Sequence, residues 1–229
     1  MKRFSVLYPI KFILAFCSIV YELLLAQSLS AFMEDTVLRY SVTIGLYMFS
    51  LGAGAWITEG RMARNAALTL SGVELSLTAV GSGSVALLYM FGALNIPRLL
   101  FAVCAHLLII AIGVLTGMEI PLLTELRNKE KEGAENFILA ADYAGAFTGT
   151  IVFAFVFYSR MGLVAAAFLT GFLNAATGVL LITQRDKVQG GVRYFKAAIA
   201  AQVVLGVLLI IFFRHAAGIS EYFYRHYTR

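Results

Sequence analysis

Residues 97–126 read PRLLFAVCAHLLIIAIGVLTGMEIPLLTEL. Between Arg98 and Glu119 this stretch contains no Asp, Glu, Lys or Arg, and Pro121 follows the carboxylate two positions later. An α-helix needs about 20 predominantly apolar residues to cross the hydrocarbon core of a bilayer. The stretch is therefore predicted to be a membrane-spanning helix that carries one carboxylate near its end.

The whole chain has the composition of a membrane protein. Its 229 residues are 60% hydrophobic and 14% charged, with a mean hydropathy of +0.84, whereas a soluble domain has about 25% charged residues. Seven apolar segments are long enough to span a bilayer: 9–31, 37–58, 67–93, 97–123, 137–158, 161–183 and 195–213. We predict an all-α, polytopic membrane protein, with a bundle of about seven transmembrane helices over residues 1–213 and a short amphipathic tail at 214–229.

The basic residues lie mainly in the short connections between these segments. The net charge is +5 and the pI is about 9.3. When Lys and Arg are counted on alternate sides of the membrane, twelve share the side of the N-terminus and six lie opposite. Because cytoplasmic loops are enriched in Lys and Arg, the N-terminus is predicted to be cytoplasmic, and the basic charge needs no nucleic-acid partner to explain it. Seven crossings would then place the tail outside.

Four carboxylates fall within the predicted spans: Glu22, Glu74, Glu119 and Asp142. A carboxylate costs about 2.5–3.5 kcal/mol at the centre of a spanning helix, so each is expected to face the bundle or a water-filled cavity. Lys11 is about three turns from Glu22, too far for a pair. Since only His106 is expected at these depths, the carboxylates are predicted to lack counter-charges and to suit a cationic ligand or a proton.

Tyr143, next to Asp142, completes this candidate ligand-binding set. For Glu74 and Glu119 an alternative stays open, because a carboxylate near an interface can instead snorkel toward water or remain protonated. Two cysteines, Cys17 and Cys104, lie in apolar segments and are expected to pack there. The histidines show no ligand spacing, so neither a metal nor a cofactor is predicted.

Helical phase, at about 100° per residue, groups small and polar residues on one face of five spans. The faces are Lys11, Ala15, Ser18, Glu22 and Ala26; Thr43, Tyr47, Ser50 and Gly54; Ser71, Glu74, Thr78 and Gly81; Asp142, Gly145 and Gly149; and Thr170, Asn174 and Thr177. They are predicted to meet in one interior. Gly113, Gly117, Gly145 and Gly149 are expected to be helix-packing positions, with Glu119 facing a different neighbour from Gly113 and Gly117.

Pro121 removes the backbone hydrogen bond to the carbonyl of Gly117. Two interpretations remain open. The proline is either a hinge that opens the end of this helix, or the point near the interface at which the helix ends.

Four segments resemble a known family: VYELLLAQSLS (20–30), EDTVLRYSVTIGLYMFSLGAGAW (34–56), GMEIPLL (117–123) and ADYAGAFTGTIVF (141–153). They are similar to the membrane domain of bacterial integral-membrane spermidine synthase-like proteins. The resemblance implies a bundle of about seven helices that precedes a cytosolic aminopropyltransferase domain of Rossmann type. The tail ISEYFYRHYTR (219–229) resembles the lead-in to that domain.

The catalytic part of that family has no counterpart in this chain. The Gly-rich loop and acidic residues that bind decarboxylated S-adenosylmethionine and the amine are absent from the sequence. The resemblance thus implies that the chain does not catalyse aminopropyl transfer alone, and that it is a truncated form or a stand-alone membrane subunit. A cytosolic domain after the last helix also requires an even number of crossings when the N-terminus is inside, which conflicts with seven.

The leading hypothesis is a non-catalytic membrane module of a polyamine-linked system in the bacterial inner membrane. It would anchor a cytosolic aminopropyltransferase domain or subunit and bind a polyamine at the intramembrane carboxylates. One alternative is a small proton-coupled transporter of a cation or lipid, and another is a purely structural subunit. Its surroundings would be the lipid bilayer, and association with a second copy is left open.

Overall fold

A computed structural model describes residues 6–58, 61–128 and 135–227 of the chain. The described residues are helical, with no strand among them. The elements in chain order are α1 (Leu7–Met33), α2 (Thr36–Ile57), the short α3 (Arg61–Arg64), α4 (Ala66–Ala93), α5 (Arg98–Asn128), α6 (Glu135–Val152), the π-helix η1 (Phe153–Met161), α7 (Leu163–Leu180), the 3-10 helix η2 (Leu181–Lys187) and α8 (Val192–Tyr227).

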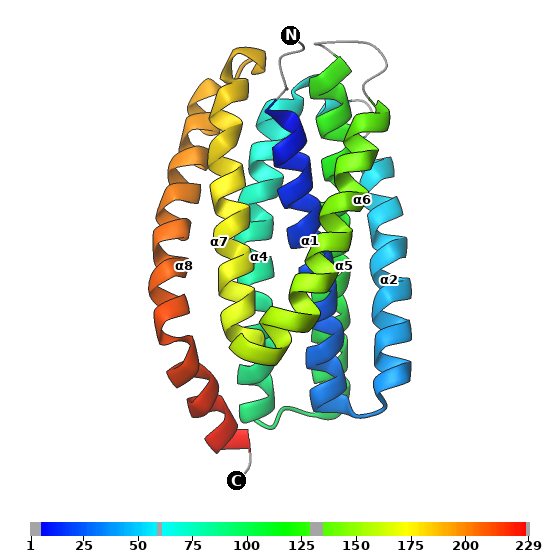
Figure 1. Cartoon of the computed structure of the whole chain (residues 1–229), viewed down its shortest axis with the longest axis vertical. Helices are drawn as coiled ribbons and strands as arrows, with labels where there is room; N and C mark the ends of the chain where they lie inside the picture. The colour runs from blue at the N-terminus through cyan, green and yellow to red at the C-terminus, as the bar shows by residue number, and fades with distance from the viewer. Residues whose placement is uncertain (1–5, 59–60, 129–134, 228–229) are drawn as a thin grey trace.

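Seven helical segments of the described chain are long and apolar enough to cross a membrane. Each one matches a predicted span, so the prediction of seven long helices is confirmed. They run side by side, and the two chain ends lie at opposite ends of the bundle (Figure 1). Helix α1 packs against α2, α4, α5, α6 and α7, and it therefore supplies the centre of the core. Helix α8 packs on α7 and α4 at one side.

The predicted interior faces are the buried faces. In α2 the buried residues are Thr43, Tyr47, Ser50 and Gly54, the four that helical phase had grouped. The grouped residues of α4 and α7 are buried as well. On α1, only Ser18 of the grouped set is partly exposed. The phase of the small and polar residues therefore indicated correctly which side of each helix faces the bundle.

Glycines bring two helix pairs into backbone contact. A side chain at Gly117 of α5 would collide with the carbonyl oxygen of Leu51 in α2, and a Cβ at Gly113 would lie 2.6 Å from the Cβ of Ser50. On α6, a side chain at Gly145 would collide with the carbonyl oxygen of Phe12 in α1, and Gly149 faces α1 in the same way. Small residues permit this close approach of helices.

Two helices continue beyond the predicted ends. Helix α5 passes through Pro121 and ends at Asn128, so the interpretation that the proline ends the helix is wrong, while its role as a hinge stays a prediction. Helix α8 continues past residue 213 to Tyr227 as one helix. The apolar run of this helix stops near residue 213. The residues that follow contain no proline, and loss of hydrophobicity alone does not end a helix.

Tight turns connect some helices. Gly162 alone joins η1 to α7, with φ 79° and ψ 161°, a combination open essentially to glycine only.

The prediction of orientation depends in part on basic residues that the structure does not describe. Of those counted above, Lys2, Arg3, Lys129, Lys131 and Arg229 lie outside the described residues. Because the described helices cross the bundle seven times, the N-terminal and C-terminal ends lie on opposite faces.

Candidate functional site

Three charged side chains from different helices meet near the end of the bundle that holds the N-terminus. The Nζ atom of Lys11 lies 3.2 Å from Oε2 of Glu119 and 2.8 Å from Oδ1 of Asp142. Lys11 and Glu119 are each 1% exposed, and Asp142 is 22% exposed. An ammonium group held by two carboxylates at such distances forms charge-assisted hydrogen bonds. We call these three residues the Lys11 cluster.

The Lys11 cluster corrects one expectation from the sequence. The carboxylates were predicted to lack a counter-charge, and for Glu119 and Asp142 that prediction is wrong. Helix α1 begins at Leu7, so Lys11 lies about one turn inside it. This is the level at which α5 approaches its end and α6 begins, and the three side chains meet across helices whose relative register no local pattern encodes.

A second polar group lies across α4, α7 and α8. Glu74 is fully buried, and its Oε2 accepts a hydrogen bond of 3.1 Å from Nδ2 of Asn174. The same amide nitrogen lies 3.1 Å from Oγ1 of Thr78, which in turn donates to Oε1 of Gln202 at 3.0 Å. Oε1 of Glu74 has no hydrogen-bond partner among the described residues. We call these four residues the Glu74 network.

The structure brings only some of the predicted ligand-binding residues together. Glu119 and Asp142 share Lys11, and Glu74 lies close enough to Glu119 for their charges to interact. Glu22 is about three turns along α1 from Lys11, in the middle of the bundle. Tyr143 is 71% exposed and lies on the outer side of α6, apart from the carboxylates.

Sequence analysis gave no role to two residues that the structure connects. Gln202 is fully buried and closes the Glu74 network. Its signal was present, because it is the single strongly polar residue within the apolar run 197–212. Thr116 of α5 accepts a hydrogen bond of 3.2 Å from the Tyr47 hydroxyl of α2. A lone threonine in an apolar helix offers no comparable signal.

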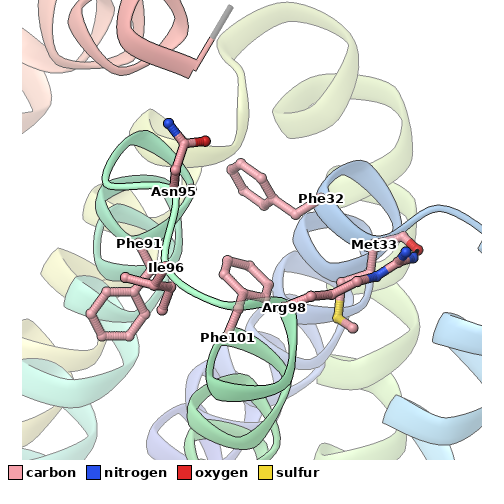
Figure 2. A pocket seen from close by; sticks show the side chains of 8 residues that line it. Phe32, Met33, Phe91, Asn95, Ile96, Arg98 and Phe101 are labelled. Atoms are coloured by element: carbon pink, nitrogen blue, oxygen red, sulfur yellow. Dashed lines mark hydrogen bonds between the residues drawn. The ribbon is translucent and has the colours of Figure 1, made fainter.

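A small pocket of about 120 Å³ lies at the opposite end of the bundle, where α1 and α4 end and α5 begins (Figure 2). It is lined by Phe32, Met33, Phe91, Gly92, Asn95, Ile96, Arg98 and Phe101. Nη2 of Arg98 donates a 2.9 Å hydrogen bond to the carbonyl oxygen of Met33. The pocket thus combines three phenylalanine rings with the polar Asn95 and Arg98, and it is separate from the carboxylates.

The buried charges determine what the interior can do chemically. Two carboxylates, Glu119 and Asp142, contact a single ammonium group, that of Lys11, whereas Glu74 is hydrogen-bonded to the neutral amide of Asn174. A buried charge without compensation is costly, so such a group takes up a proton or pairs with a cation. The fold and these charges define a bundle of seven long apolar helices with an internal, carboxylate-rich polar core.

Comparison with known proteins relates this bundle to one class of enzyme by sequence. The chain is 34% identical over 178 residues to the polyamine aminopropyltransferase of Leptospira interrogans, a match that covers 76% of this chain and 35% of the relative. It is 36% identical over 193 residues to polyamine aminopropyltransferase 2 of Streptomyces coelicolor, covering 79% and 34%. The relative from Oceanobacillus iheyensis, also a polyamine aminopropyltransferase, is 29% identical over 214 residues, covering 91% and 40%.

The chain is therefore related to polyamine aminopropyltransferases over most of its own length. It spans only about a third of the length of the curated relatives that it matches. No family model matches the chain, and no solved structure matches it. The relationship agrees with the spermidine synthase-like resemblance of the four sequence segments.

Proposed function

We propose that the chain is a non-catalytic, integral-membrane module of a polyamine-linked system, and that it binds a polyamine at the carboxylates around Lys11. The link to polyamines rests on its relatives, which are polyamine aminopropyltransferases. The module would hold an aminopropyltransferase domain or subunit at the bacterial inner membrane.

The distribution of side chains supports membrane insertion. Large apolar side chains are exposed along α2 and α8, among them Phe49, Trp56 and Val204. Four charged residues within the apolar helices, Lys11, Glu22, Glu74 and Glu119, are buried. Exposed apolar surface of this extent is unfavourable in water, whereas in a bilayer the same arrangement places apolar groups against lipid and charges against the bundle interior.

The observation that carries the binding proposal is the position of the Lys11 ammonium. A primary ammonium group at 2.8 and 3.2 Å from two carboxylates makes the contacts that an alkylammonium ion would make with these side chains, which supports the proposal. A polyamine presents several such groups on one flexible chain. Glu74, whose Oε1 lacks a partner, supplies a further acceptor for a second ammonium group nearby.

Spermidine-induced thermal stabilisation of the purified chain in detergent tests the proposal. A ligand that binds only the folded state stabilises it by about 2.7 kcal/mol at 100 times its Kd. We expect spermidine to raise the melting temperature, whereas NaCl of equal ionic strength does not. The double variant Glu74→Gln/Asp142→Asn should lose this shift, and Glu22→Gln, outside the cluster, should keep it. A full shift in the double variant would exclude the carboxylates as the polyamine site.

The orientation of the bundle determines where a cytosolic partner can bind. Among the described residues, the end that holds the N-terminus carries Arg64, Arg127, Arg185, Lys187 and Lys196, which favours a cytoplasmic location for this end. With seven crossings, a cytosolic aminopropyltransferase would then meet the loops of this basic end. Green fluorescent protein fused to the C-terminus should be dark and alkaline phosphatase active at that position. The opposite result would place the C-terminal end in the cytoplasm and make it the attachment point.

A further inference from the structure

A column of hydroxyl groups leads from the Lys11 cluster into the middle of the bundle, along the seam between α1, α2 and α5. Its centre is Tyr47 of α2. The Tyr47 hydroxyl lies 3.0 Å from Oγ of Ser18 in α1 and donates a 3.2 Å hydrogen bond to Oγ1 of Thr116 in α5. Thr116 precedes Glu119 by three residues, so the two share one side of α5. The column thus begins at the carboxylate that binds Lys11.

Glu22 lies at the next position of this column, one turn beyond Ser18 on α1. It is 8% exposed, and its carboxylate has no hydrogen-bond or ion-pair partner among the described residues. The pairing of Ser18 with Tyr47 and of Gln27 with Tyr40 sets the antiparallel register of α1 and α2. In that register Thr43 lies at the level of Glu22.

Thr43 is fully buried, and its Oγ1 also lacks a hydrogen-bond partner. Buried polar groups in proteins are almost always hydrogen-bonded. A carboxylate and a hydroxyl group without partners, at the same level in the middle of the bundle, therefore call for an explanation beyond stability.

The column continues to the surface at the other end. The Tyr40 hydroxyl, one turn from Thr43, donates a 2.6 Å hydrogen bond to Oε1 of Gln27. The Gln27 amide donates to the hydroxyl of Tyr158 at 3.3 Å, and Tyr158 is 53% exposed. At the opposite end the partly exposed Asp142 opens the Lys11 cluster to the outside. Polar side chains therefore run through the bundle from one end to the other.

We propose that this column conducts protons across the bundle, with Glu22 as the carboxylate that accepts and releases the proton midway. The inference adds to the proposed function and shares with it the placement in a membrane and the Lys11 cluster, at which the column begins. A proton from the Lys11 cluster passes along Thr116, Tyr47 and Ser18, where each hydroxyl accepts one proton and gives up another. It protonates the Glu22 carboxylate, which then releases a proton toward Thr43 and Tyr40. Gln27 is hydrogen-bonded to both Tyr40 and Tyr158 and holds these two hydroxyls at the exit, so that one proton enters and one leaves per passage.

The geometry favours a proton over a larger cation. The Tyr47 side chain is buried and hydrogen-bonded to both neighbouring helices, so an ammonium or metal ion would have to displace it. A proton needs only donors and acceptors in reach. Four steps lack a direct hydrogen bond. Three of them, from Glu119 to Thr116, from Ser18 to Glu22 and from Thr43 to Tyr40, are each about one turn of one helix, roughly 5–6 Å between Cβ atoms, a gap that a bridging water spans. The fourth, from Glu22 to Thr43, crosses from α1 to α2 at one level of the bundle and needs a bridging water as well.

Other titratable groups surround α1. Those that face this seam are Tyr40, Tyr47, Glu119, Asp142 and Tyr158, and those on the opposite side of α1 are Cys17, Tyr21 and Glu74. Tyr21 is the useful control, because it is as deeply buried as Tyr47, but its hydroxyl has no hydrogen-bond partner among the described residues and lies outside the column.

Proton flux into liposomes tests the proposal. The full chain is reconstituted with a trapped pH-sensitive dye, and a valinomycin-generated potassium potential drives protons inward. We expect acidification faster than in protein-free vesicles, a loss of at least tenfold of the excess rate in Glu22→Gln, and a large loss in Tyr47→Phe, which keeps the ring but removes the hydroxyl. Tyr21→Phe is the matched control for Tyr47→Phe and should conduct like the unaltered chain.

Each outcome decides the question. Flux equal to that of protein-free vesicles, or unaltered flux in Glu22→Gln, would overturn the proposal, and so would a loss in Tyr21→Phe as large as in Tyr47→Phe. If Glu22→Gln does not fold, Tyr47→Phe decides, since unaltered flux in that variant removes the column. Spermidine stabilisation should persist in Glu22→Gln, so a failure of proton conduction and a failure of polyamine binding are distinguishable.

Discussion

Glu119 and Glu74 are equally buried carboxylates in the same half of the bundle, but their hydrogen-bond and ion-pair partners differ. Glu119 lies against the ammonium of Lys11 at 3.2 Å. Glu74 has only an amide donor, that of Asn174 at 3.1 Å, and one of its oxygens lacks a partner. The side formed by α1, α5 and α6 therefore compensates charge with charge, and the side formed by α4, α7 and α8 compensates it with neutral hydrogen bonds.

This difference separates two uses of a buried carboxylate. An ion pair stabilises the fold only as long as both partners are present, because either charge left alone in the interior is strongly unfavourable. A carboxylate supported by neutral donors keeps its place when its charge is removed. Stability should thus depend on the Lys11 cluster, and the Glu74 network should be the part that tolerates a change of charge.

Lys11→Met should give the largest effect. It leaves Glu119 and Asp142 together without their cation, which is expected to cost about 3–5 kcal/mol. The change is measured as the free energy of unfolding in an SDS titration followed by circular dichroism. Lys196→Met, at an exposed position of α8, is the control and should stay within about 0.5 kcal/mol.

A triple variant sharpens this test. Replacement of the whole cluster by Lys11→Met/Glu119→Gln/Asp142→Asn removes all three charges and should recover much of the loss, since neutral replacements of a buried ion pair are often tolerated. If Lys11→Met unfolds no more easily than Lys196→Met, the cluster does not stabilise the bundle.

Replacement of one glycine on each side by alanine should give an intermediate difference in the free energy of unfolding. At Gly145 a Cβ meets the backbone of α1 at Phe12, whereas at Gly178 it meets the end of the Gln202 side chain. Backbone cannot move aside, so Gly145→Ala should cost about 1–3 kcal/mol. The Gln202 side chain can shift, at the cost of weakening its hydrogen bond with Thr78, and the gain in helix propensity offsets part of that cost, so Gly178→Ala should cost about 1 kcal/mol, less than Gly145→Ala. Equal losses in thermal unfolding would show that α6 is free to shift on α1.

Glu74→Gln should give the smallest effect. The glutamine oxygen keeps the hydrogen bond from Asn174, and the uncompensated charge is gone, so stability should stay unchanged or rise by up to about 1 kcal/mol. Glu119→Gln, measured in the same assay, should lose about 1–3 kcal/mol because Lys11 retains only Asp142. A loss in Glu74→Gln as large as that in Glu119→Gln would erase the distinction between the two sides.

Much of this arrangement could be predicted from the sequence. The long apolar runs gave all seven helices, and helical phase gave their buried faces, because both depend on local spacing. Helical phase also predicted that Glu119 faces a different helix from Gly113 and Gly117. In the structure Glu119 contacts α1, and the two glycines contact α2.

What the sequence could not show depends on how helices distant in the chain are aligned. Lys11 was compared with Glu22 on its own helix, whereas its partners are 108 and 131 residues away along the chain, as the residue numbers of Glu119 and Asp142 show. The contact of Tyr47 with Ser18 and Thr116 likewise requires the register of three helices. Such registers are set by packing across the whole bundle and leave no periodic signal in one segment.

The single-residue turn at Gly162 bears on how the chain enters a membrane during synthesis. Consecutive Cα atoms are about 3.8 Å apart, so the end of η1 and the start of α7 cannot separate by more than about twice that length. A translocation channel that releases helices one after another needs a linker between them, and only Gly162 lies between η1 and α7. In the membrane proposed above, the segment from α6 to α7 would therefore partition as one helical hairpin, and Arg160, near its tip, would cross the bilayer in that step.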